Sequence, residues 1–378
     1  MSTSRTLEPR VPSASDVAAL CRGPLAEWYA LNRRMLPWRA LPPDPYAVWV
    51  SETMLQQTRV VTARPFFERW MASFPTVEAL ARAPLDEVLR LWAGLGYYAR
   101  ARSLHAAARS LVEQRGGVLP RTAAELEALP GVGRYTAGAI ASVAFDAPAP
   151  VVDANVARVL SRVFAVDAEP RSARGSARLW ELAAELVPRR GAGDHNQALM
   201  ELGALVCAPH DPRCGACPLE PACAAAHTRE PTAWPRPSAR RRVVRVQHSS
   251  AVVRRGDRVL VARRHETGLW GGLWEFPRRL CAPGEDPRAC AARAAREVVG
   301  LRATVTGTVA MVRHSVTHHA IVLHALACEA PRGRAQARDC AEVRWVEIEA
   351  LDGLALSSPQ AGVAAALRGR AAGGAASR

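Results

Sequence analysis

Four cysteines with metal-ligand spacing lie within one short stretch of the chain. Cys207, Cys214, Cys217 and Cys223 follow the pattern Cys-x6-Cys-x2-Cys-x5-Cys. Four thiolates this close can enclose one metal centre, either a zinc ion or an iron–sulfur cluster. Ligand type alone leaves both metals open. The other cysteines are scattered, which suits a reducing cytoplasm better than a disulfide framework.

Two carboxylates are candidates for acid–base chemistry. Glu52 lies in VWVSETMLQQT, and Asp153 lies in VVDANVARVL just before an expected helix. Cleavage of an N-glycosidic bond needs an acid that protonates the leaving group and an anion that stabilises the sugar cation. Each residue also has an ordinary explanation, because a helical Glu is usually solvated and an Asp often caps a helix. Only the fold could bring the two together.

A glycine-rich turn could hold an anion. LPGVGRYTAGAI, residues 129–140, places Gly131 and Gly133 before a helix that should begin near Arg134. Glycine permits close backbone approach, and the amides at a helix N-terminus attract phosphate. Thr122 and Glu125 form a capping box for a short preceding helix, which predicts helix, hairpin turn, helix. An ordinary turn between helices is the alternative for the bare Pro-Gly-x-Gly string.

The motifs occur together in the order found in one enzyme family. LPWR (36–39), SETMLQQT (51–58), GLGYYARAR (94–102), LPGVGRYTAGAI, VDANVARVL (152–160), NQALMELGALVC (196–207), the four-cysteine loop and WGGLWEFP (270–277) resemble segments of the MutY-type adenine DNA glycosylases. The hairpin is similar to that of the wider endonuclease III superfamily. This resemblance implies base excision repair, in which adenine opposite 8-oxoguanine or guanine is flipped out of double-stranded DNA and removed hydrolytically.

The resemblance assigns roles to individual residues. It implies that Glu52 is the general acid, that Asp153 faces the sugar cation, and that Asn155 and Tyr135 support them. The positions expected to contact DNA or the extruded adenine are Trp38, Arg39, Gln57, Leu95, Tyr97, Gly131, Gly133 and Gln197. The four cysteines are expected to hold a [4Fe-4S] cluster that serves structure and DNA docking.

Two departures from relatives of this fold matter. Relatives that also nick the strand have a lysine at position 135, which forms a Schiff base with the sugar. This chain has tyrosine there and no lysine anywhere, so a monofunctional glycosylase is expected. The adenine glycosylases commonly have glycine at position 154. Ala154 would strain the Asp153 loop if that position needed a positive φ.

Composition agrees with a polyanionic partner. The formal net charge is +15 and the sequence pI is about 10.5, with every one of the 50 basic residues an arginine. Residues 1–14 lack the apolar core of a signal peptide, and no run approaches the roughly 20 apolar residues of a membrane helix. We therefore expect a monomer in the bacterial cytosol, associated with the nucleoid, with no membrane partner.

The spacing of apolar residues and the local composition change along the chain. Helical spacing over residues 15–226 predicts a mainly α glycosylase region with the cluster loop at 207–223, after a disordered stretch at 1–14. Residues 227–245 are rich in proline and arginine and predict a linker. Strand-like runs and one helix near 287–299 predict a smaller α+β Nudix-like domain at 246–365, with a disordered tail at 366–378.

We expect the second domain to recognise a DNA lesion rather than to hydrolyse a nucleoside diphosphate. A Nudix hydrolase needs several carboxylates on one helix to grip magnesium. This helix keeps Glu297 but has Ala294 and Val298 where two further ligands would stand. The resemblance instead implies contact with 8-oxoguanine by RHSVTHHAI (313–321), with Thr317 and His318 as candidates. A plain surface turn is the alternative.

Three other functions fit parts of the sequence. A bifunctional lyase acting on oxidised pyrimidines would share the hairpin and cluster, but the missing lysine opposes it. A non-enzymatic iron–sulfur DNA-binding protein would make Glu52 and Asp153 incidental. A Nudix phosphohydrolase with a DNA-binding appendage is opposed by the incomplete set of carboxylates on its helix.

Overall fold

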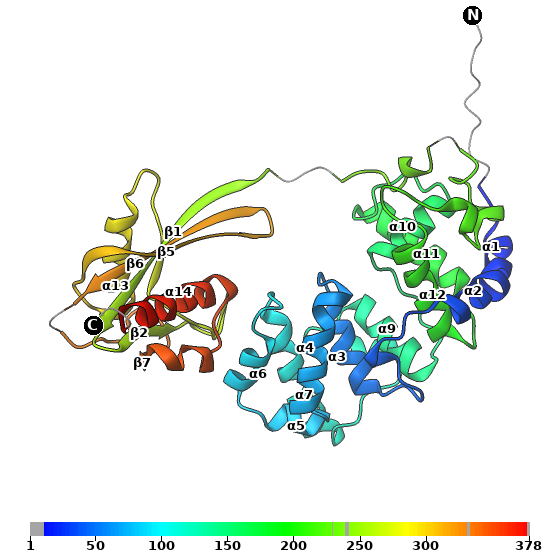
Figure 1. The fold of residues 1–378 in the computed structure, drawn as a ribbon. Helices are drawn as coiled ribbons and strands as arrows, with labels where there is room; N and C mark the ends of the chain where they lie inside the picture. The colour runs from blue at the N-terminus through cyan, green and yellow to red at the C-terminus, as the bar shows by residue number, and fades with distance from the viewer. Residues whose placement is uncertain (1–10, 229, 239–241, 331–332, 376–378) are drawn as a thin grey trace, which may run out of the picture. The chain divides into compact units, whose positions relative to one another are not determined.

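The computed structural model describes residues 11–228, 230–238, 242–330 and 333–375. The chain divides into two compact units, coloured along the sequence in Figure 1. The helical unit comprises Met1–Glu78 and Ala106–Ala239, and the sheet unit comprises Ala79–His105 and Arg240–Arg378. Within the described residues, every helix is too short or too polar to cross a bilayer. The predicted fold class, a mainly α region followed by a smaller α+β Nudix-like domain, is confirmed.

The helices of the N-terminal two thirds begin where capping residues predict. Asp44 caps α3 with Pro45 at its first position, Asp153 caps α10, and Ser172 caps α11. The α-helices are α1 (Ala14–Leu20), α2 (Ala26–Asn32), α3 (Pro45–Leu55), α4 (Val60–Ser73), α5 (Val77–Arg82), α6 (Leu85–Trp92), α7 (Ala99–Arg115), α8 (Ala123–Glu127), α9 (Arg134–Phe145), α10 (Ala154–Val163), α11 (Ala173–Leu186) and α12 (Ala192–Leu205).

Helices α10 and α12 pack closely in the core of the helical unit. Their apolar side chains, including Val156, Leu160, Leu199 and Leu202, belong to one buried cluster. The approach depends on Gly203, because a Cβ there would lie 2.6 Å from the Cβ of Asn155. The packing of α12 therefore constrains the residues that begin α10.

The predicted helix–hairpin–helix is present as α8, a turn and α9. The Thr122 hydroxyl accepts a hydrogen bond from the Glu125 amide, as the N-cap of a capping box does, and it also donates to the Glu125 carboxylate. Gly131 has φ +75°, and Gly133 is the N-cap of α9. Open space surrounds the Cβ position of Gly133, so the backbone is accessible at the start of α9.

A seven-stranded sheet forms most of the sheet unit. The main strand order is β3-β2-β1-β6-β5, β4 also pairs with β1, and β7 pairs with β2. Strands β1 and β6 are parallel, whereas the other pairs are antiparallel. The bounds are β1 (Val244–Arg255), β2 (Arg258–Arg263), β3 (Trp274–Glu275), β4 (Arg278–Leu280), β5 (Thr304–Val316), β6 (His319–Glu329) and β7 (Glu342–Glu347).

Helices cover both faces of this sheet. Helix α13 (Pro287–Val299) packs through Ala291, Ala295 and Val299 on one face, and α14 (Ser358–Ala375) packs through Val363 and Leu367 on the other. Asp286 caps α13, and Gly300 ends it with φ +72°. The helix predicted near residues 287–299 is thus confirmed.

Residues 79–105 pack on the C-terminal part of the sheet unit. The Tyr98 hydroxyl donates to the Leu356 carbonyl, and Arg102 donates to the Gly271 carbonyl at 2.8 Å. Arg263 pairs with Asp86 at 2.9 Å. The glycosylase region expected over residues 15–226 is therefore interrupted, because helix α6 and the start of α7 belong to the sheet unit.

The segment boundaries also differ in detail from those expected. Trp234, inside the predicted linker, is buried in the core of the helical unit. Helix α14 continues to Ala375, so the prediction of a disordered tail from 366 is corrected for residues 366–375. At the other end, Ser13 caps α1 and Ala14 begins it, so the prediction of disorder over 1–14 is corrected for these two residues. Residues 1–10 and 376–378 of the predicted disordered ends lie outside the described residues.

Candidate active site

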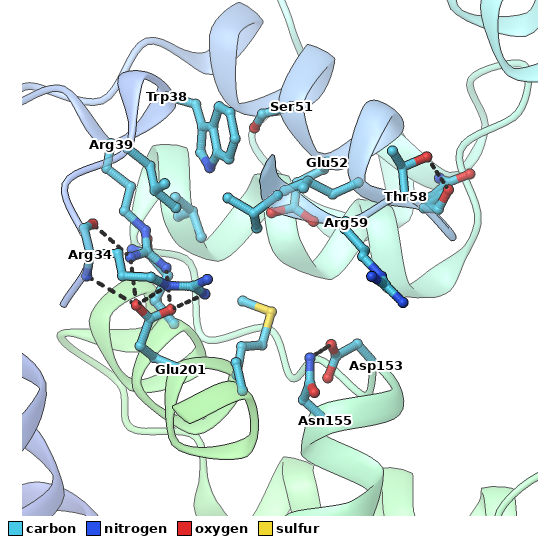
Figure 2. Close-up of a pocket in the computed structure, with 18 of the residues that line it drawn as sticks. Arg34, Trp38, Arg39, Ser51, Glu52, Thr58, Arg59, Asp153, Asn155 and Glu201 are labelled. Carbon is cyan, nitrogen blue, oxygen red and sulfur yellow. Dashed lines mark hydrogen bonds and ion pairs between the residues drawn. The ribbon is translucent and has the colours of Figure 1, made fainter. Parts of the chain in front are cut away.

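A cavity of about 890 Å³ brings together residues from five segments of the helical unit. Its walls come from residues 34–39, from α3 and the residues after it, from α9 with Tyr135, from the start of α10, and from α12. Both Glu52 and Asp153 line it, although 101 positions separate them in the sequence. Figure 2 shows Glu52 on one wall and Asp153 with Asn155 on the facing one.

Glu52 has the environment of a proton donor. Its side chain is buried on α3 and its Oε2 accepts a 2.8 Å hydrogen bond from the Tyr135 hydroxyl. Burial raises the pKa of Glu52 to about 7, because the charged form loses its hydration; the Tyr135 hydrogen bond opposes this rise and the nearby Asp153 adds to it. A carboxyl group with this pKa is still partly protonated at neutral pH and can act as an acid there.

Asp153 has a different environment from Glu52. Its Oδ1 accepts a 2.7 Å hydrogen bond from the Val156 amide, and its Oδ2 accepts one of 2.8 Å from the Asn155 amide group. Burial raises the pKa of Asp153, and these hydrogen bonds oppose the rise by stabilising the carboxylate. Ala154 is the first residue of α10 and adopts helical geometry, so the strain considered for this position does not arise.

A buried ion-pair network closes another wall of the cavity. Glu201 on α12 accepts hydrogen bonds from Arg34 at 2.7 and 2.8 Å and from Arg39 at 3.1 Å, drawn as dashed lines in Figure 2. Burial alone would raise the pKa of Glu201, but these guanidinium contacts lower it to about 2. Sequence reasoning missed Glu201 and Arg34; the only signal was a carboxylate within the largely apolar string ALMELGAL.

The other residues expected to contact DNA or adenine divide between the two units. Trp38, Arg39, Gln57 and Gln197 line the cavity of the helical unit. Gln57 is exposed and has φ +59°, as suits a residue at a sharp turn. Tyr97, in the sheet unit, is 44% exposed with φ +49°, and the Arg100 guanidinium lies over its ring. Leu95 is buried, so this structure does not present it as a wedge.

The four clustered cysteines do converge. All of them line one small pocket together with Arg162. Arg162, buried on α10, donates to the Cys207 Sγ at 3.3 Å and to the Ala208 carbonyl at 2.7 Å. No three of these four sulfur atoms come within 4.8 Å of one another in the described chain.

Thr317 occupies the tip of a hairpin in the sheet unit. Val316 pairs with His319 across strands β5 and β6, so Thr317 and His318 form a two-residue turn. Thr317 has φ +54°, a conformation that β-branched residues rarely adopt. Its hydroxyl donates to the Val316 carbonyl at 2.7 Å and lies 3.4 Å from the His318 Nδ1. A hydroxyl oxygen has two lone pairs, so it keeps capacity to accept another bond. The expected loop 313–321 is therefore two strands with a short turn.

The comparisons with known proteins agree with this site. Residues 50–185 match the family model described as "HhH-GPD superfamily base excision DNA repair protein", and residues 250–366 match the NUDIX domain. The chain is 43% identical over 322 residues to the adenine DNA glycosylase of Mus musculus, covering 72% of this chain and 62% of that protein. It is 34% identical over 254 residues to that of Buchnera aphidicola subsp. Schizaphis graminum, covering 67% and 73%. This chain belongs to the adenine DNA glycosylase family.

Solved structures and relative lengths complete the comparison. A thermostable thymine-DNA glycosylase is 30% identical with a TM-score of 0.51, over 55% of this chain and 96% of that chain. The match spans about three fifths of the length of the mammalian members of the adenine DNA glycosylase family. Ala294 and Val298, at the positions where a Nudix hydrolase would have further carboxylates, are buried in the sheet unit. The remaining carboxylate, Glu297, pairs with Arg279 at 3.1 Å.

Proposed function

We propose that this chain is a monofunctional adenine DNA glycosylase of base excision repair. The observation that carries the proposal is the pairing, in one cavity, of a buried Glu52 whose pKa is about 7 with a hydrogen-bonded Asp153. Two carboxyl groups held in different environments can act at one pH as an acid and as an anion. Hydrolysis of an N-glycosidic bond needs both.

The reaction follows from these two environments. Adenine enters the cavity after it is flipped out of the duplex. Glu52 donates its proton to a ring nitrogen of adenine, and the electrons of the breaking glycosidic bond pass to the base. The Asp153 carboxylate stabilises the cationic sugar that remains. Water then adds to the anomeric carbon and loses a proton.

Tyr135 accounts for the absence of strand cleavage. Its hydroxyl is committed to Glu52, and the chain contains no lysine that could form a Schiff base with the sugar. Release of adenine therefore leaves an abasic site in an intact strand. The same contact orients the acid, so Tyr135 is a positioning residue.

Adenine selection is proposed for the part of the cavity lined by residues 34–39 and α12. A Gln amide such as that of Gln197 can bond to both N6 and N7 of adenine. Arg39 is held in place by the ionised Glu201 and lines the same space. These groups favour adenine over bases that present a different pattern of donors and acceptors.

The four-cysteine loop is proposed to hold a [4Fe-4S] cluster. Cys207, Cys214, Cys217 and Cys223 would supply all the ligands, so the group would stabilise the loop and present it to DNA. Arg162 donates to the Cys207 sulfur, and such a bond suits a thiolate ligand. The convergence of the four cysteines in one pocket and their compact spacing in the sequence support this proposal.

Double-stranded DNA is the proposed partner of a monomeric enzyme. The accessible backbone at Gly131 and Gly133 before α9 can take a phosphate, and the chain's large positive charge attracts one. Gln57 and Tyr97 have the exposure and turn geometry of residues that fill an opened duplex.

Lesion recognition is proposed for the Thr317 hairpin. 8-Oxoguanine differs from guanine at N7, where it carries a hydrogen, and at the C8 oxygen. The Thr317 hydroxyl already donates to a carbonyl, so its oxygen can accept a bond from that N7–H and not from the bare N7 of guanine. A bond that only N7–H can donate favours 8-oxoguanine over guanine. His318 is the neighbouring residue of the turn.

A duplex containing adenine opposite 8-oxoguanine tests the proposed activity. We expect free adenine, with strand scission only after heat or alkali. Borohydride should trap no efficient covalent adduct through a side-chain amine. Prompt scission without alkali would favour the bifunctional lyase, and no adenine release by cluster-loaded protein would favour the non-enzymatic DNA-binding alternative.

A further inference from the structure

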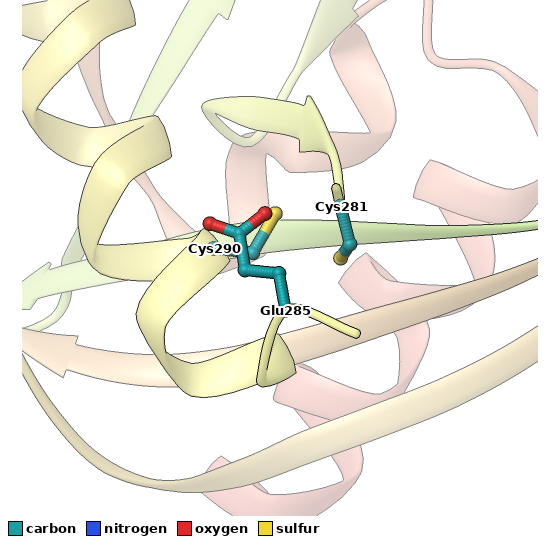
Figure 3. A group of neighbouring side chains, drawn as sticks. All are labelled: Cys281, Glu285 and Cys290. Carbon is teal, nitrogen blue, oxygen red and sulfur yellow. The ribbon is translucent and has the colours of Figure 1, made fainter. Parts of the chain in front are cut away.

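A second group of metal-ligand side chains lies in the sheet unit, far in sequence from the four-cysteine loop. Cys281 follows β4, Glu285 lies in the turn after it, and Cys290 belongs to the first turns of α13 (Figure 3). One ligand atom from each of the three lies within 4.8 Å of the other two. The geometry points to a zinc site formed by Cys281, Glu285 and Cys290, with water in the fourth position.

The distances suit a single small ion. Zinc binds thiolate sulfur at about 2.3 Å and carboxylate oxygen at about 2.0–2.2 Å, so tetrahedral ligands stand roughly 3.5–3.8 Å apart. The present separations exceed this by about 1 Å at most. Side-chain rotation could close that gap without moving the strand or the helix. Two thiolates and a carboxylate select zinc over magnesium or calcium, which prefer oxygen ligands alone.

The backbone around the three ligands is fixed by its own hydrogen bonds. The Cys281 amide donates to the Gln247 carbonyl of β1 at 2.9 Å. The Glu285 carboxylate accepts from the Ala282 amide at 2.7 Å, which holds the turn closed. Cys290 is fully buried, while Cys281 and Glu285 are partly exposed. One side of the site therefore opens to solvent, where an ion can enter and a water ligand can bind.

Arg293 completes the charge balance. Its guanidinium donates to both oxygens of Glu285, at 2.9 and 2.7 Å, and thereby orients the carboxylate as an outer-shell partner would. Two thiolates and one carboxylate carry three negative charges, which one zinc ion and Arg293 neutralise. Burial raises the pKa of the Cys290 thiol to about 12. Because zinc binds the thiolate form, zinc binding would release protons to the buffer.

This site is distinct from both metal sites already considered. It uses none of the cysteines of the 207–223 loop. It also lies at the N-terminal end of α13, whereas Ala294 and Val298 mark the carboxylate positions of a Nudix hydrolase further along that helix. The inference does not depend on the glycosylase activity proposed above, and adenine release neither supports nor weakens it.

Metal content of the full-length protein tests the site. Wild type and Cys281→Ser are equilibrated with a slight excess of zinc under reducing conditions, desalted, and analysed for zinc and iron per chain. We expect the variant to hold one zinc fewer and the same amount of iron. Cys340→Ser is the matched control, because Cys340 is also a buried cysteine of the sheet unit but lies outside the group. It should retain the zinc.

A second variant covers the case in which Cys281→Ser does not fold. Glu285→Gln keeps the shape of the side chain, and we expect its zinc affinity to fall at least about tenfold, the smallest loss typical when even an outer-shell partner is removed. X-ray absorption at the zinc edge should show two zinc–sulfur contacts for the ion at this site in wild type, from Cys281 and Cys290. Equal zinc contents and affinities in wild type and the folded variant would overturn the site, whether the two thiols are then found free or joined in a disulfide.

Discussion

At the scale of single residues, the site depends on how one carboxyl group keeps its proton. Glu52 and Asp153 are chemically alike, and burial raises the pKa of both. They differ in their hydrogen bonds: Glu52 accepts from a single hydroxyl, whereas Asp153 accepts from a backbone amide and a side-chain amide. The sequence motif predicts both residues, and these different contacts are the basis of the separate roles proposed for them.

The first prediction concerns the pH dependence of Tyr135→Phe. In wild type, the single-turnover rate should fall as pH rises through about 7, because Glu52 loses its proton there. The Tyr135 hydrogen bond lowers the pKa of Glu52, so its removal raises that pKa and the descending limb should move to higher pH. Rates of adenine release measured from pH 5 to 9 check this.

Tyr46→Phe is the matched control for that profile. It removes a buried hydroxyl that donates to the Phe74 carbonyl, away from Glu52. Its descending limb should coincide with that of wild type. An unshifted limb in Tyr135→Phe, or a shift to lower pH, would contradict the proposed effect of the Tyr135 contact.

At the scale of elements, α3, α9, α10 and α12 hold the site residues. The sequence predicts most of these helices correctly, because capping residues and apolar spacing are local signals. It could not predict the Glu201 network, since the arginine partners lie more than 160 positions away. Leu95 was assigned to DNA by its motif, but the fold buries it. Tertiary packing decides such cases, and local pattern does not contain it.

Gly203→Ala tests the contact between α10 and α12. The added Cβ would lie 2.6 Å from the Asn155 Cβ and 3.1 Å from its backbone, which cannot move aside cheaply. We expect unfolding free energy to fall by about 1–3 kcal/mol and the rate of adenine release to fall with it. Thermal unfolding and single-turnover kinetics measure the two effects. Gly353→Ala, where open space surrounds the new methyl group, is the control. Equal behaviour of the two variants would show that the close approach is unimportant.

The cysteine loop is the second element with a direct test. Cys214→Ser should lose the brown colour and most of the iron, because four ligands hold one cluster and its binding is coupled to folding of the loop. Cys21→Ser, a buried cysteine in the core of the helical unit, should keep both. Iron analysis and visible absorption of protein purified without air decide the outcome. Zinc in place of iron in the wild-type loop would contradict the cluster.

At the scale of the whole molecule, we propose catalysis for the helical unit and lesion recognition for the sheet unit. A natural test is truncation before Arg245, which should leave adenine release from a mismatch while reducing the preference for 8-oxoguanine over guanine at least about tenfold. The structure adds a complication, because residues 79–105 would lose their partners at Leu356 and Gly271. A point substitution at the hairpin therefore separates recognition from stability better.

Thr317→Ala is that substitution. Loss of one hydrogen bond of about 1 kcal/mol should lower the preference for adenine opposite 8-oxoguanine over adenine opposite guanine about fivefold. The rate on the guanine mismatch should stay unchanged, because guanine has no N7–H to donate. Thr308→Ala, on the same strand but away from the turn, serves as control. Unchanged discrimination in a folded Thr317→Ala protein would place lesion recognition elsewhere.

Glu52→Gln tests the proposed acid, by single-turnover excision on a duplex with adenine opposite 8-oxoguanine. Glutamine preserves shape and can still accept from Tyr135, but it has no acidic proton to give to adenine. We expect a rate at least about 10²-fold below wild type, since general acid catalysis contributes roughly 10²- to 10⁴-fold. Affinity for the same duplex should stay within a few-fold of wild type. A folded, cluster-loaded variant that keeps more than about a tenth of the wild-type rate would contradict Glu52 as the acid.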